Sequence, residues 1–370
     1  MWLWYGAFIG LFWFWWISLG LQHYGYIWGL PFGISLVGFS YGIIFWTIAW
    51  ISEKIEILFF LPSIIIKALA LLGFSYFHPL GFDWLKPELM FIESYIGIEK
   101  WQFAIVLVAM VLSILKKQLF YLLLILFAYQ VHTQTQNTVP KNIHIVTTHI
   151  SVKDKWDTAK HPTQFEAFFQ IIDQAIDDNK TLIIFPESVF PIFLNHSQET
   201  IDKLQKRAKH ISIVTGGLYW DGKTPRNSTY IFTNDTLTVA NKVVLVPFGE
   251  SNPLPDFLSN WVNKVFYDGA IDYEASSDVI DYDINGNTYR NAICFEASSE
   301  KLYEKDKNGN YPKNMIVLSN NGWFVPSIEP TLQKLLLQYY SKKYGTTIYH
   351  SVNMSLSYII KDGKSLNIKP

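Results

Sequence analysis

The chain divides into two regions with different patterns of hydrophobic and polar positions. From Met1 to about Gln130, long apolar runs rich in Trp, Phe, Leu and Ile follow one another. From about Thr138 onward, short apolar runs alternate with polar and charged turns. In a chain of 370 residues, such a change predicts at least two structural regions. We expect a transmembrane helical region at 1–132 and a water-facing domain at 138–370.

The first region holds enough apolar sequence for about five membrane crossings. The hydrocarbon core of a bilayer is roughly 30 Å thick, so a spanning helix needs about 20 mainly apolar residues. The start MWLWYGAFIG has neither a basic leader nor a small-residue cleavage site, so it does not resemble a signal peptide. The predicted spans cover residues 2–19, 27–51, 55–76, 101–115 and 118–129.

Basic residues in the short loops suggest an orientation. Lys54, Lys116 and Lys117 are predicted to lie in loops on one side, whereas the opposite loop, 77–100, is mainly acidic. The positive-inside rule then predicts a cytoplasmic N-terminus and, after five spans, a second region outside the cytoplasm. Lys67 falls in the third predicted span, where a charge costs about 3 kcal/mol on insertion scales. It is expected to meet a lipid headgroup or a buried acid, or to snorkel to the interface.

The second region opens with a strand, a helix and a second strand. Residues 143–148 and 181–185 are strand-like, and between them Phe165, Phe168 and Ile172 recur at helical spacing. An α/β or α+β layered domain of about 220 residues fits this pattern. Further elements are expected as helices at 198–210 and 330–344, a strand at 211–215, hairpin turns at Asn234-Asp235 and Asn285-Gly286, and strands near Val243, Ala292, Ile316, Ile348 and Leu356.

The composition of the chain limits the kinds of partner, disulfide and metal site that it can have. The formal net charge is only -1, which makes nucleic acid an unexpected partner. Cys294 is the single cysteine, which excludes an intramolecular disulfide and a multi-thiolate metal site. The nine histidines show no ligand spacing, so the sequence predicts no metal, and nothing in it suggests another cofactor.

Three segments place a reactive side chain just after a strand-like run. They are LIIFPES with Glu187, ANKVVLVPFGE with Lys242 and Glu250, and RNAICFE with Cys294 and Glu296. Strand ends and the loops after them are where rigid scaffolds hold catalytic groups. These residues are therefore our candidates for an active site.

The residue types suit nucleophilic acyl transfer. A thiolate attacks ester carbonyls well, but a free cysteine has a pKa of about 8.5 and needs activation at neutral pH. Glu187 can accept the thiol proton and later deprotonate an amine, and the Lys242 ammonium can offset charge on a carbonyl oxygen.

In this order, with Lys242 55 residues after Glu187 and Cys294 52 residues after Lys242, the segments resemble the Glu, Lys, Cys triad of the nitrilase superfamily. The apolar region ahead of them, KW at Lys155 and Trp156, VPFGE at 246–250 and SNNGWF at 319–324 resemble the apolipoprotein N-acyltransferase family. Phe295 departs from the Tyr often found after the nucleophile. The resemblance implies an α-helical transmembrane bundle followed by a nitrilase-type domain, a four-layer α-β-β-α sandwich.

The resemblance also implies a reaction. An acyl chain would move from a membrane phospholipid to Cys294 as a thioester, and then to the N-terminal α-amine of a diacylated apolipoprotein. The protein would be a multi-pass protein of the cell inner membrane, in contact with the lipid bilayer, with its catalytic domain on the periplasmic side. Supporting roles would fall to Glu250, Glu296, Trp156 and Phe295.

A thioester open to water would hydrolyse, so the site needs an apolar cover. The stretch 253–271 begins with prolines yet carries Trp261, Phe266 and Tyr267, and a second apolar group contains Trp323 and Phe324. We expect both to act as lids or membrane-dipping arms.

Other interpretations remain open at this point. The same triad could pass the acyl group to water, as a membrane-tethered carbon-nitrogen hydrolase, or the chain could be an inactive, truncated scaffold. Cys294 could be a small buried core residue, and Glu187 with Lys242 a surface pair. Trp156 and the lid aromatics could likewise be ordinary packing, and Glu250 and Glu296 purely structural acids.

Overall fold

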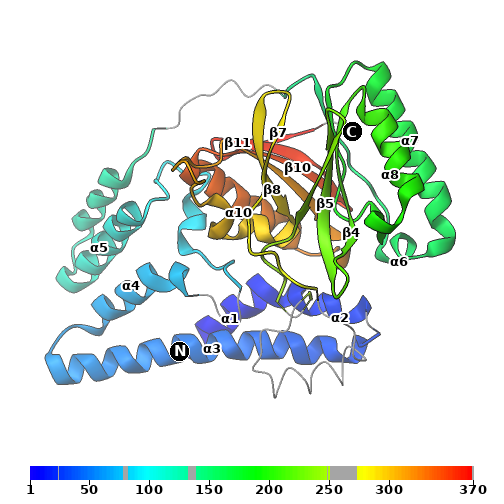
Figure 1. The fold of residues 1–370 in the computed structure, drawn as a ribbon. Helices are drawn as coiled ribbons and strands as arrows, with labels where there is room; N and C mark the ends of the chain where they lie inside the picture. Colours follow the sequence, from blue (N-terminus) through cyan, green and yellow to red (C-terminus); the bar gives the residue numbers. More distant parts are fainter. Residues whose placement is uncertain (24, 78–81, 132–138, 248, 251–272, 369–370) are drawn as a thin grey trace. The chain divides into compact units, whose positions relative to one another are not determined.

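A computed structural model of the protein describes residues 1–23, 25–77, 82–131, 139–247, 249–250 and 273–368 (Figure 1). The chain forms two compact units. The first comprises Met1–Gln134 and Pro326–Leu335, and the second comprises Thr135–Val325 and Leu336–Pro370. The predicted boundary at 132–138 lies outside the described residues.

The first unit is built from apolar helices. Two of its helical stretches, Trp2–His23 and Ile27–Phe59, are long and apolar enough to cross a membrane, and Ser63–Tyr76 and Leu119–Ala128 are shorter apolar helices. The five crossings therefore remain a prediction. The elements are α1 (Trp2–Phe14), α2 (Gly20–His23), α3 (Leu30–Phe59), α4 (Ser63–Gly73), α5 (Lys100–Lys116) and 3-10 segments at Trp15–Leu19, Ile27–Gly29, Phe74–Tyr76, Pro87–Phe91 and Leu119–Ala128.

Helix α3 runs further than its sequence pattern predicts. The expected break near Lys54 is wrong, because Lys54 lies inside the helix, which ends only at Phe59. Phe60 then adopts a left-handed conformation (φ 56°), and Pro62 precedes α4. A proline disfavours helical backbone at the residue before it, which explains why the break falls here. Lys67 of α4 has its Nζ 3.9 Å from a carboxylate oxygen of Glu53 on α3.

Glycines bring α1 and α3 into close contact. Gly6 and Gly10 lie one turn apart on α1, and Gly38 and Gly42 do the same on α3. A Cβ added at Gly10 would lie 2.8 Å from the Val37 carbonyl oxygen, and one at Gly6 would collide with the main chain of α3. Pairs of small residues spaced in this way allow helix backbones to approach closely in membrane proteins.

The second unit contains two six-stranded sheets. In the first sheet the order is β1-β2-β4-β5-β6, with β3 also pairing with β4, and β1, β2, β3 and β4 run parallel. In the second sheet the order is β12-β11-β10-β9-β8-β7, with β8, β9 and β10 parallel. The strands are β1 (Ile143–Ile145), β2 (Leu182–Ile184), β3 (Phe190–Phe193), β4 (Ser212–Trp220), β5 (Pro225–Thr233), β6 (Thr236–Asn241), β7 (Asp281–Ile284), β8 (Asn287–Ile293), β9 (Asn314–Asn320), β10 (Thr347–Asn353), β11 (Tyr358–Lys361) and β12 (Lys364–Asn367).

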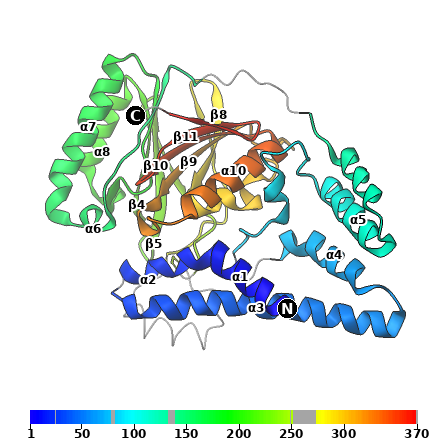
Figure 2. The same cartoon turned by 180° about the vertical axis from the view of Figure 1, so that it is seen from behind.

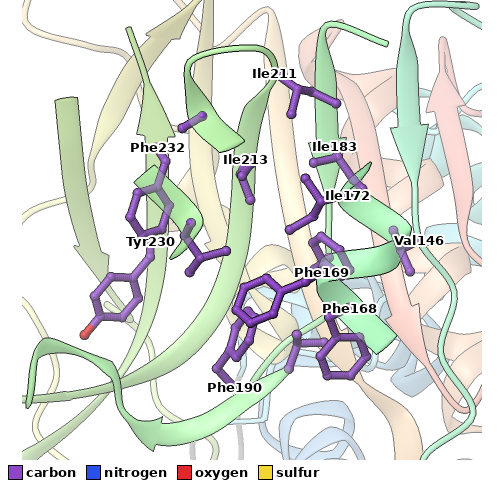
Figure 3. Close-up of a cluster of buried hydrophobic side chains, with 14 of the residues drawn as sticks. Val146, Phe168, Phe169, Ile172, Ile183, Phe190, Ile211, Ile213, Tyr230 and Phe232 are labelled. Atoms are coloured by element: carbon purple, nitrogen blue, oxygen red, sulfur yellow. The ribbon is translucent and has the colours of Figure 1, made fainter. Parts of the chain in front are cut away.

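Two buried clusters hold this unit together. In the first, helices α7 (His161–Asp177) and α8 (Gln198–Ala208), which lie side by side in Figures 1 and 2, pack on the first sheet. Figure 3 shows Phe168, Phe169 and Ile172 of α7 reaching toward Ile183, Phe190 and the strands around them. In the second cluster, Ile184 and Val214 meet Ile316 and Leu318, so the two sheets pack face to face.

The remaining helices of this unit are short, apart from α10, whose residues up to Leu335 belong to the first unit and the rest to the second. They are α6 (Val152–Lys155), α10 (Glu329–Tyr344) and 3-10 segments at Thr158–Lys160, Leu194–His196, Cys294–Ser298, Glu300–Tyr303 and Asn321–Trp323. The C-terminal part of α10 is joined to the turn between β11 and β12, where the Gln338 side-chain amide donates to the Gly363 carbonyl at 2.9 Å.

Both predicted hairpin turns are confirmed. Asn234-Asp235 joins β5 to β6 and Asn285-Gly286 joins β7 to β8, with φ between 48° and 78° at all four residues. Two-residue hairpins favour such residues because both positions need positive φ. Two strand predictions are displaced: β6 ends at Asn241, before Val243, and β11 begins at Tyr358, beyond Leu356. The apolar run that begins at Val243 lies beyond the last paired residue of β6, and Leu356 lies two residues before β11.

Candidate active site

The three predicted catalytic side chains all follow the carboxyl end of a strand. Lys242 directly follows β6, Cys294 directly follows β8, and Glu187 lies three residues after β2. Cys294 has φ 52°, and Ser188, next to Glu187, has φ 47°. Positive φ is costly for residues with a Cβ and persists only where the surroundings enforce it. The second unit therefore holds these two turns in conformations that they would not adopt by themselves.

Lys242 is the centre of a buried network of charged and polar groups. The side chain is 1% exposed, and its Nζ lies 2.7 Å from an oxygen of Glu250. The Asn227 side-chain amide donates to Glu187 at 2.7 Å and to Glu250 at 3.0 Å. Glu250 also accepts from the Val246 main-chain N–H at 2.9 Å. Glu187 and Glu250 are therefore held on the same amide, beside one cation.

Glu296 ties the loop after Lys242 to the turn at Cys294. Its carboxylate, which is fully buried, accepts main-chain N–H groups of Val243 at 2.6 Å, Val244 at 3.0 Å and Ile293 at 2.7 Å. Burial raises the pKa of Glu296 to about 7, although Lys242 and these three N–H groups oppose the rise. This carboxyl links the two segments that carry the candidate cation and the candidate nucleophile.

The charges of the site act on one another. Burial raises the pKa of Glu187 above its ordinary value, against the opposing charge of Lys242. For Lys242, burial works to lower the pKa, but the charges of Glu250, Glu187 and Cys294 outweigh it, so the pKa is raised. Lys242 therefore stays an ammonium at neutral pH, and it is close enough to Cys294 to be influenced by its charge. The charges of Glu187 and Cys294 both act on Lys242, and their joint catalytic role stays a prediction.

Two residues that sequence reasoning gave no role belong to this site. Asn227 lies inside β5 and is 5% exposed, and a polar residue in mid-strand gave no signal of function. Lys155 ends α6, is 1% exposed and donates from Nζ to the Glu187 main-chain carbonyl at 2.9 Å. Its signal was the KW pair, in which only Trp156 was assigned a role.

The other predicted residues differ in their surroundings. Trp156 is 39% exposed, whereas Phe295, next to Cys294, is buried. Trp323 and Phe324 are half-buried at and just after the 3-10 segment Asn321–Trp323. The candidate lid residues Trp261, Phe266 and Tyr267 lie outside the described residues.

Comparison with known proteins defines first the class and then the family. The sequence model of one family, described as the apolipoprotein N-acyltransferase integral membrane domain, matches residues 1–133, so the chain is a membrane protein. Over 361 residues it is 38% identical to the apolipoprotein N-acyltransferase of Wolinella succinogenes, covering 96% of this chain and 84% of the relative. The enzyme of the same name from Helicobacter pylori is 33% identical to this chain, and the alignment covers 96% of this chain and 82% of the Helicobacter enzyme. The chain therefore belongs to the apolipoprotein N-acyltransferase family, and it is an acyltransferase.

Solved structures with some similarity come from the nitrilase superfamily. A CN-hydrolase superfamily protein from Xanthomonas campestris aligns with a TM-score of 0.46 at 14% identity, over 61% of this chain and 85% of that one. A member of branch 10 of the nitrilase superfamily from Saccharomyces cerevisiae aligns with a TM-score of 0.45 at 16% identity. The alignment covers 61% of this chain and 84% of that one. The family assignment rests on the sequence relatives.

Proposed function

We propose that this enzyme moves an acyl chain from a membrane phospholipid, through a thioester on Cys294, to the N-terminal α-amine of a diacylglyceryl-cysteine lipoprotein. The observation that supports the proposal is the buried network of Glu187, Asn227, Glu250 and Lys242, with the charge of Cys294 acting on Lys242. The relatives of 33% and 38% identity are named apolipoprotein N-acyltransferase, which supports the choice of an apolipoprotein amine as acceptor.

The first half-reaction loads the enzyme. Glu187 takes the proton from Cys294 Sγ, and the sulfur attacks the ester carbonyl carbon of the phospholipid. Lys242 stabilises the negative oxygen of the tetrahedral intermediate. The ester C–O bond then breaks, and the leaving alcohol receives the proton from Glu187. A lysophospholipid departs, and the acyl chain remains as a thioester.

The second half-reaction passes the chain on. The α-amine of the acceptor attacks the thioester carbon, a C–N bond forms and the C–S bond breaks. Glu187 removes the proton from the amine and returns it to Cys294 Sγ, which restores the resting thiol. The raised pKa of Glu187 suits a group that must both take and give a proton near neutral pH.

In our proposal, Glu250 and Glu296 hold the catalytic residues in place and take no part in the proton transfers. Glu250 is ion-paired with Lys242 and would keep the ammonium aimed at the carbonyl oxygen. Glu296 would hold the nucleophile turn through the Ile293 main chain. Trp156, Phe295, Trp323 and Phe324, with the candidate lid residues Trp261, Phe266 and Tyr267, would shape the apolar acyl path and exclude water from the thioester.

The proposal includes a location and an architecture. The first unit would cross the cell inner membrane several times, with the catalytic domain on the periplasmic side, in a four-layer α-β-β-α arrangement. Since Lys54 lies in α3, the orientation rests on Lys116 and Lys117 at the end of α5 against the acidic stretch 77–100.

The decisive experiment is intact-mass analysis of the purified protein after incubation with a phospholipid, with Cys294→Ala as the matched control. We expect an acyl adduct on wild type that is absent from the variant and that disappears when a diacylated lipopeptide is added. An adduct that discharges to water at the same rate without the lipopeptide would indicate a hydrolase. No adduct on a folded wild-type protein would indicate an inactive scaffold.

A further inference from the structure

Lys155 is a buried cation for which the mechanism above has no use. It lies 1% exposed at the end of α6, in the connection between β1 and α7. An ammonium withdrawn from water is unfavourable unless a specific partner compensates it. Its Nζ donates to the main-chain carbonyl of Glu187 at 2.9 Å, so a second lysine contacts the segment that carries the candidate base.

The segment around Lys155 is held from several directions. The Lys155 carbonyl is 3.0 Å from His161 Nε2, and the Ser151 hydroxyl accepts from the Asp154 N–H at 3.1 Å. The main chain of Ile150 is clamped by the Asn353 side chain, which accepts its N–H at 2.9 Å and donates to its carbonyl at 2.8 Å. The Lys155 ammonium is therefore placed by fixed neighbours from β10, α6 and α7.

Two ionisable groups from other segments, Glu187 and Cys294, act on the charge of Lys155. Burial lowers the pKa of Lys155 to about 8, while the negative charges of Glu187 and Cys294 act to raise it. On its own helix, Asp154 forms an exposed ion pair with Lys160. The charges of Lys155 and Cys294 therefore act on each other, and the geometric link of Lys155 to the site is its hydrogen bond to the Glu187 carbonyl.

The charge balance of the site gives this cation a role. The described part of the site holds the carboxyl groups of Glu187, Glu250 and Glu296, and Lys242 is already ion-paired with Glu250. When Glu187 takes the thiol proton it becomes neutral, so the thiolate at Cys294 forms beside the carboxyl groups of Glu250 and Glu296, which disfavour negative charge on the sulfur. A second ammonium would offset that effect and leave Lys242 for the carbonyl oxygen.

We propose that Lys155 is a positioning residue for acyl transfer, which fixes the Glu187 main chain and stabilises the Cys294 thiolate. The inference rests on the proposed function for its purpose. Its chemistry is confined to one proton: when Cys294 Sγ loses its proton to Glu187, the new negative charge on sulfur is balanced by the Lys155 ammonium. The purely structural alternative is that Lys155 only donates a hydrogen bond to the Glu187 carbonyl.

The test measures the thiol itself. Because Cys294 is the single cysteine, alkylation of the full-length protein by iodoacetamide, followed by intact mass, reports on this side chain alone. The rate is measured from pH 5 to pH 10, a range that brackets the ordinary cysteine pKa of about 8.5. Lys155→Gln keeps a donor without the charge, Lys155→Arg keeps the charge, and Lys155→Met removes both. Lys153→Met, on the exposed side of the same helix, is the matched control.

We expect Lys155→Gln and Lys155→Met to raise the apparent pKa of Cys294 by about 1 unit and to slow alkylation at pH 7 about tenfold. The alkylation rates of Lys155→Arg and Lys153→Met should stay within about twofold of the wild-type rate. Lys155→Arg keeps the positive charge, and Lys153→Met removes a charge that lies on the exposed side of the helix. Profiles of Lys155→Gln that overlay wild type, or a Lys155→Arg shift as large as that of Lys155→Gln, would overturn the proposal.

Two further measurements keep the proposal testable. If the variants do not fold, the alkylation profile of the wild-type protein is used instead. Loss of the Lys155 charge near pH 8 should add a second step to this profile, and a single titration between pH 7 and pH 10 would count against the proposal. A failure of the acyl-transfer function would appear instead as a wild-type protein that forms no adduct with phospholipid. That outcome leaves the alkylation profiles, and hence the inference about Lys155, to be judged separately.

Discussion

Helices α3 and α7 differ in where they place aromatic side chains. On α3, Phe39 and Trp46 are more than half exposed, while Tyr41 and Phe45 lie with Gly38 on the buried face. On α7, Phe168 and Phe169 are 3–4% exposed and point into the core. In water, burial of large apolar side chains drives folding, whereas in lipid the same side chains suit the outside and small residues bring helices together. Exposed aromatic residues and close-packed glycines on α3, against an exposed face of α7 without aromatic residues, therefore distinguish the surroundings that suit the two helices.

Both units bury charged groups that have partners. In the second unit, Lys242 is ion-paired with Glu250, and Glu187 and Glu296 accept hydrogen bonds from Asn227 and Val243. In the first unit, the fully buried Glu88 is ion-paired with Lys100, and the buried Lys86 is ion-paired with Asp83. Within the described part of the chain, only the buried charges of the second unit lie among the candidate catalytic residues.

The largest expected effect comes from removing the central cation. Lys242→Met should lower kcat for acyl transfer about 10³-fold, because the oxyanion loses its stabilising charge. It should also destabilise the second unit by about 3–5 kcal/mol, because Glu250 and Glu187 are left buried without the opposite charge. Lys209→Met, at an exposed position, is the control. Activity within twofold of wild type would exclude Lys242 from the reaction.

A charge on the outer face of α3 tests the lipid side of the comparison. Phe39→Asp should disfavour membrane insertion by about 3 kcal/mol, whereas Gln170→Asp on the exposed face of α7 should change stability by less than about 0.5 kcal/mol. The fraction of protein that resists alkaline extraction from membranes measures the first, and urea unfolding measures the second. Equal tolerance of the two substitutions would remove the distinction between the helices.

The glycine contact between α1 and α3 predicts a smaller effect. Gly6→Leu places a side chain against the α3 main chain and should destabilise the first unit by about 1–3 kcal/mol. Gly20→Leu, where an added Cβ meets nothing within 4 Å, is the matched control. Thermal unfolding in detergent measures both. If the Gly6 variant unfolds no earlier than the Gly20 variant, the close packing of the two helices is wrong.

The smallest expected effect is a shift in a pH profile. Glu187 must be ionised to take the thiol proton, so acylation rises with pH through its pKa, which burial raises above the ordinary value. Asn227→Ala removes a hydrogen bond that favours the ionised form, so the rising limb should move to higher pH, by about 1 unit or less. Ser228→Ala, on the same strand, should leave the limb in place. A limb that moves to lower pH would contradict the role of Glu187 as base.

Much of the fold and the core of the site follow from local pattern. The hairpin turns at Asn234-Asp235 and Asn285-Gly286 were predictable because positive φ at two adjacent positions selects few residue types. The three candidate catalytic residues were predictable because each one follows a strand-like apolar run in the sequence. They are Glu187, Lys242 and Cys294. The end of α3 was misplaced, because charges at Glu53 and Lys54 resemble a loop although a helix carries them without strain.

By itself, the sequence determined the division into an apolar and a water-facing region, the α/β class of the second region and the three reactive residues, because these depend on side-chain polarity and on chain neighbours. Only the tertiary structure revealed Lys155 and Asn227 as parts of the site, the glycine contact of α1 with α3, and Glu296 as the link between the Lys242 and Cys294 loops. These depend on distances between residues far apart in the chain, and on which polar groups lose water together. Such distances are set by how sheets and helices pack, which no local pattern records.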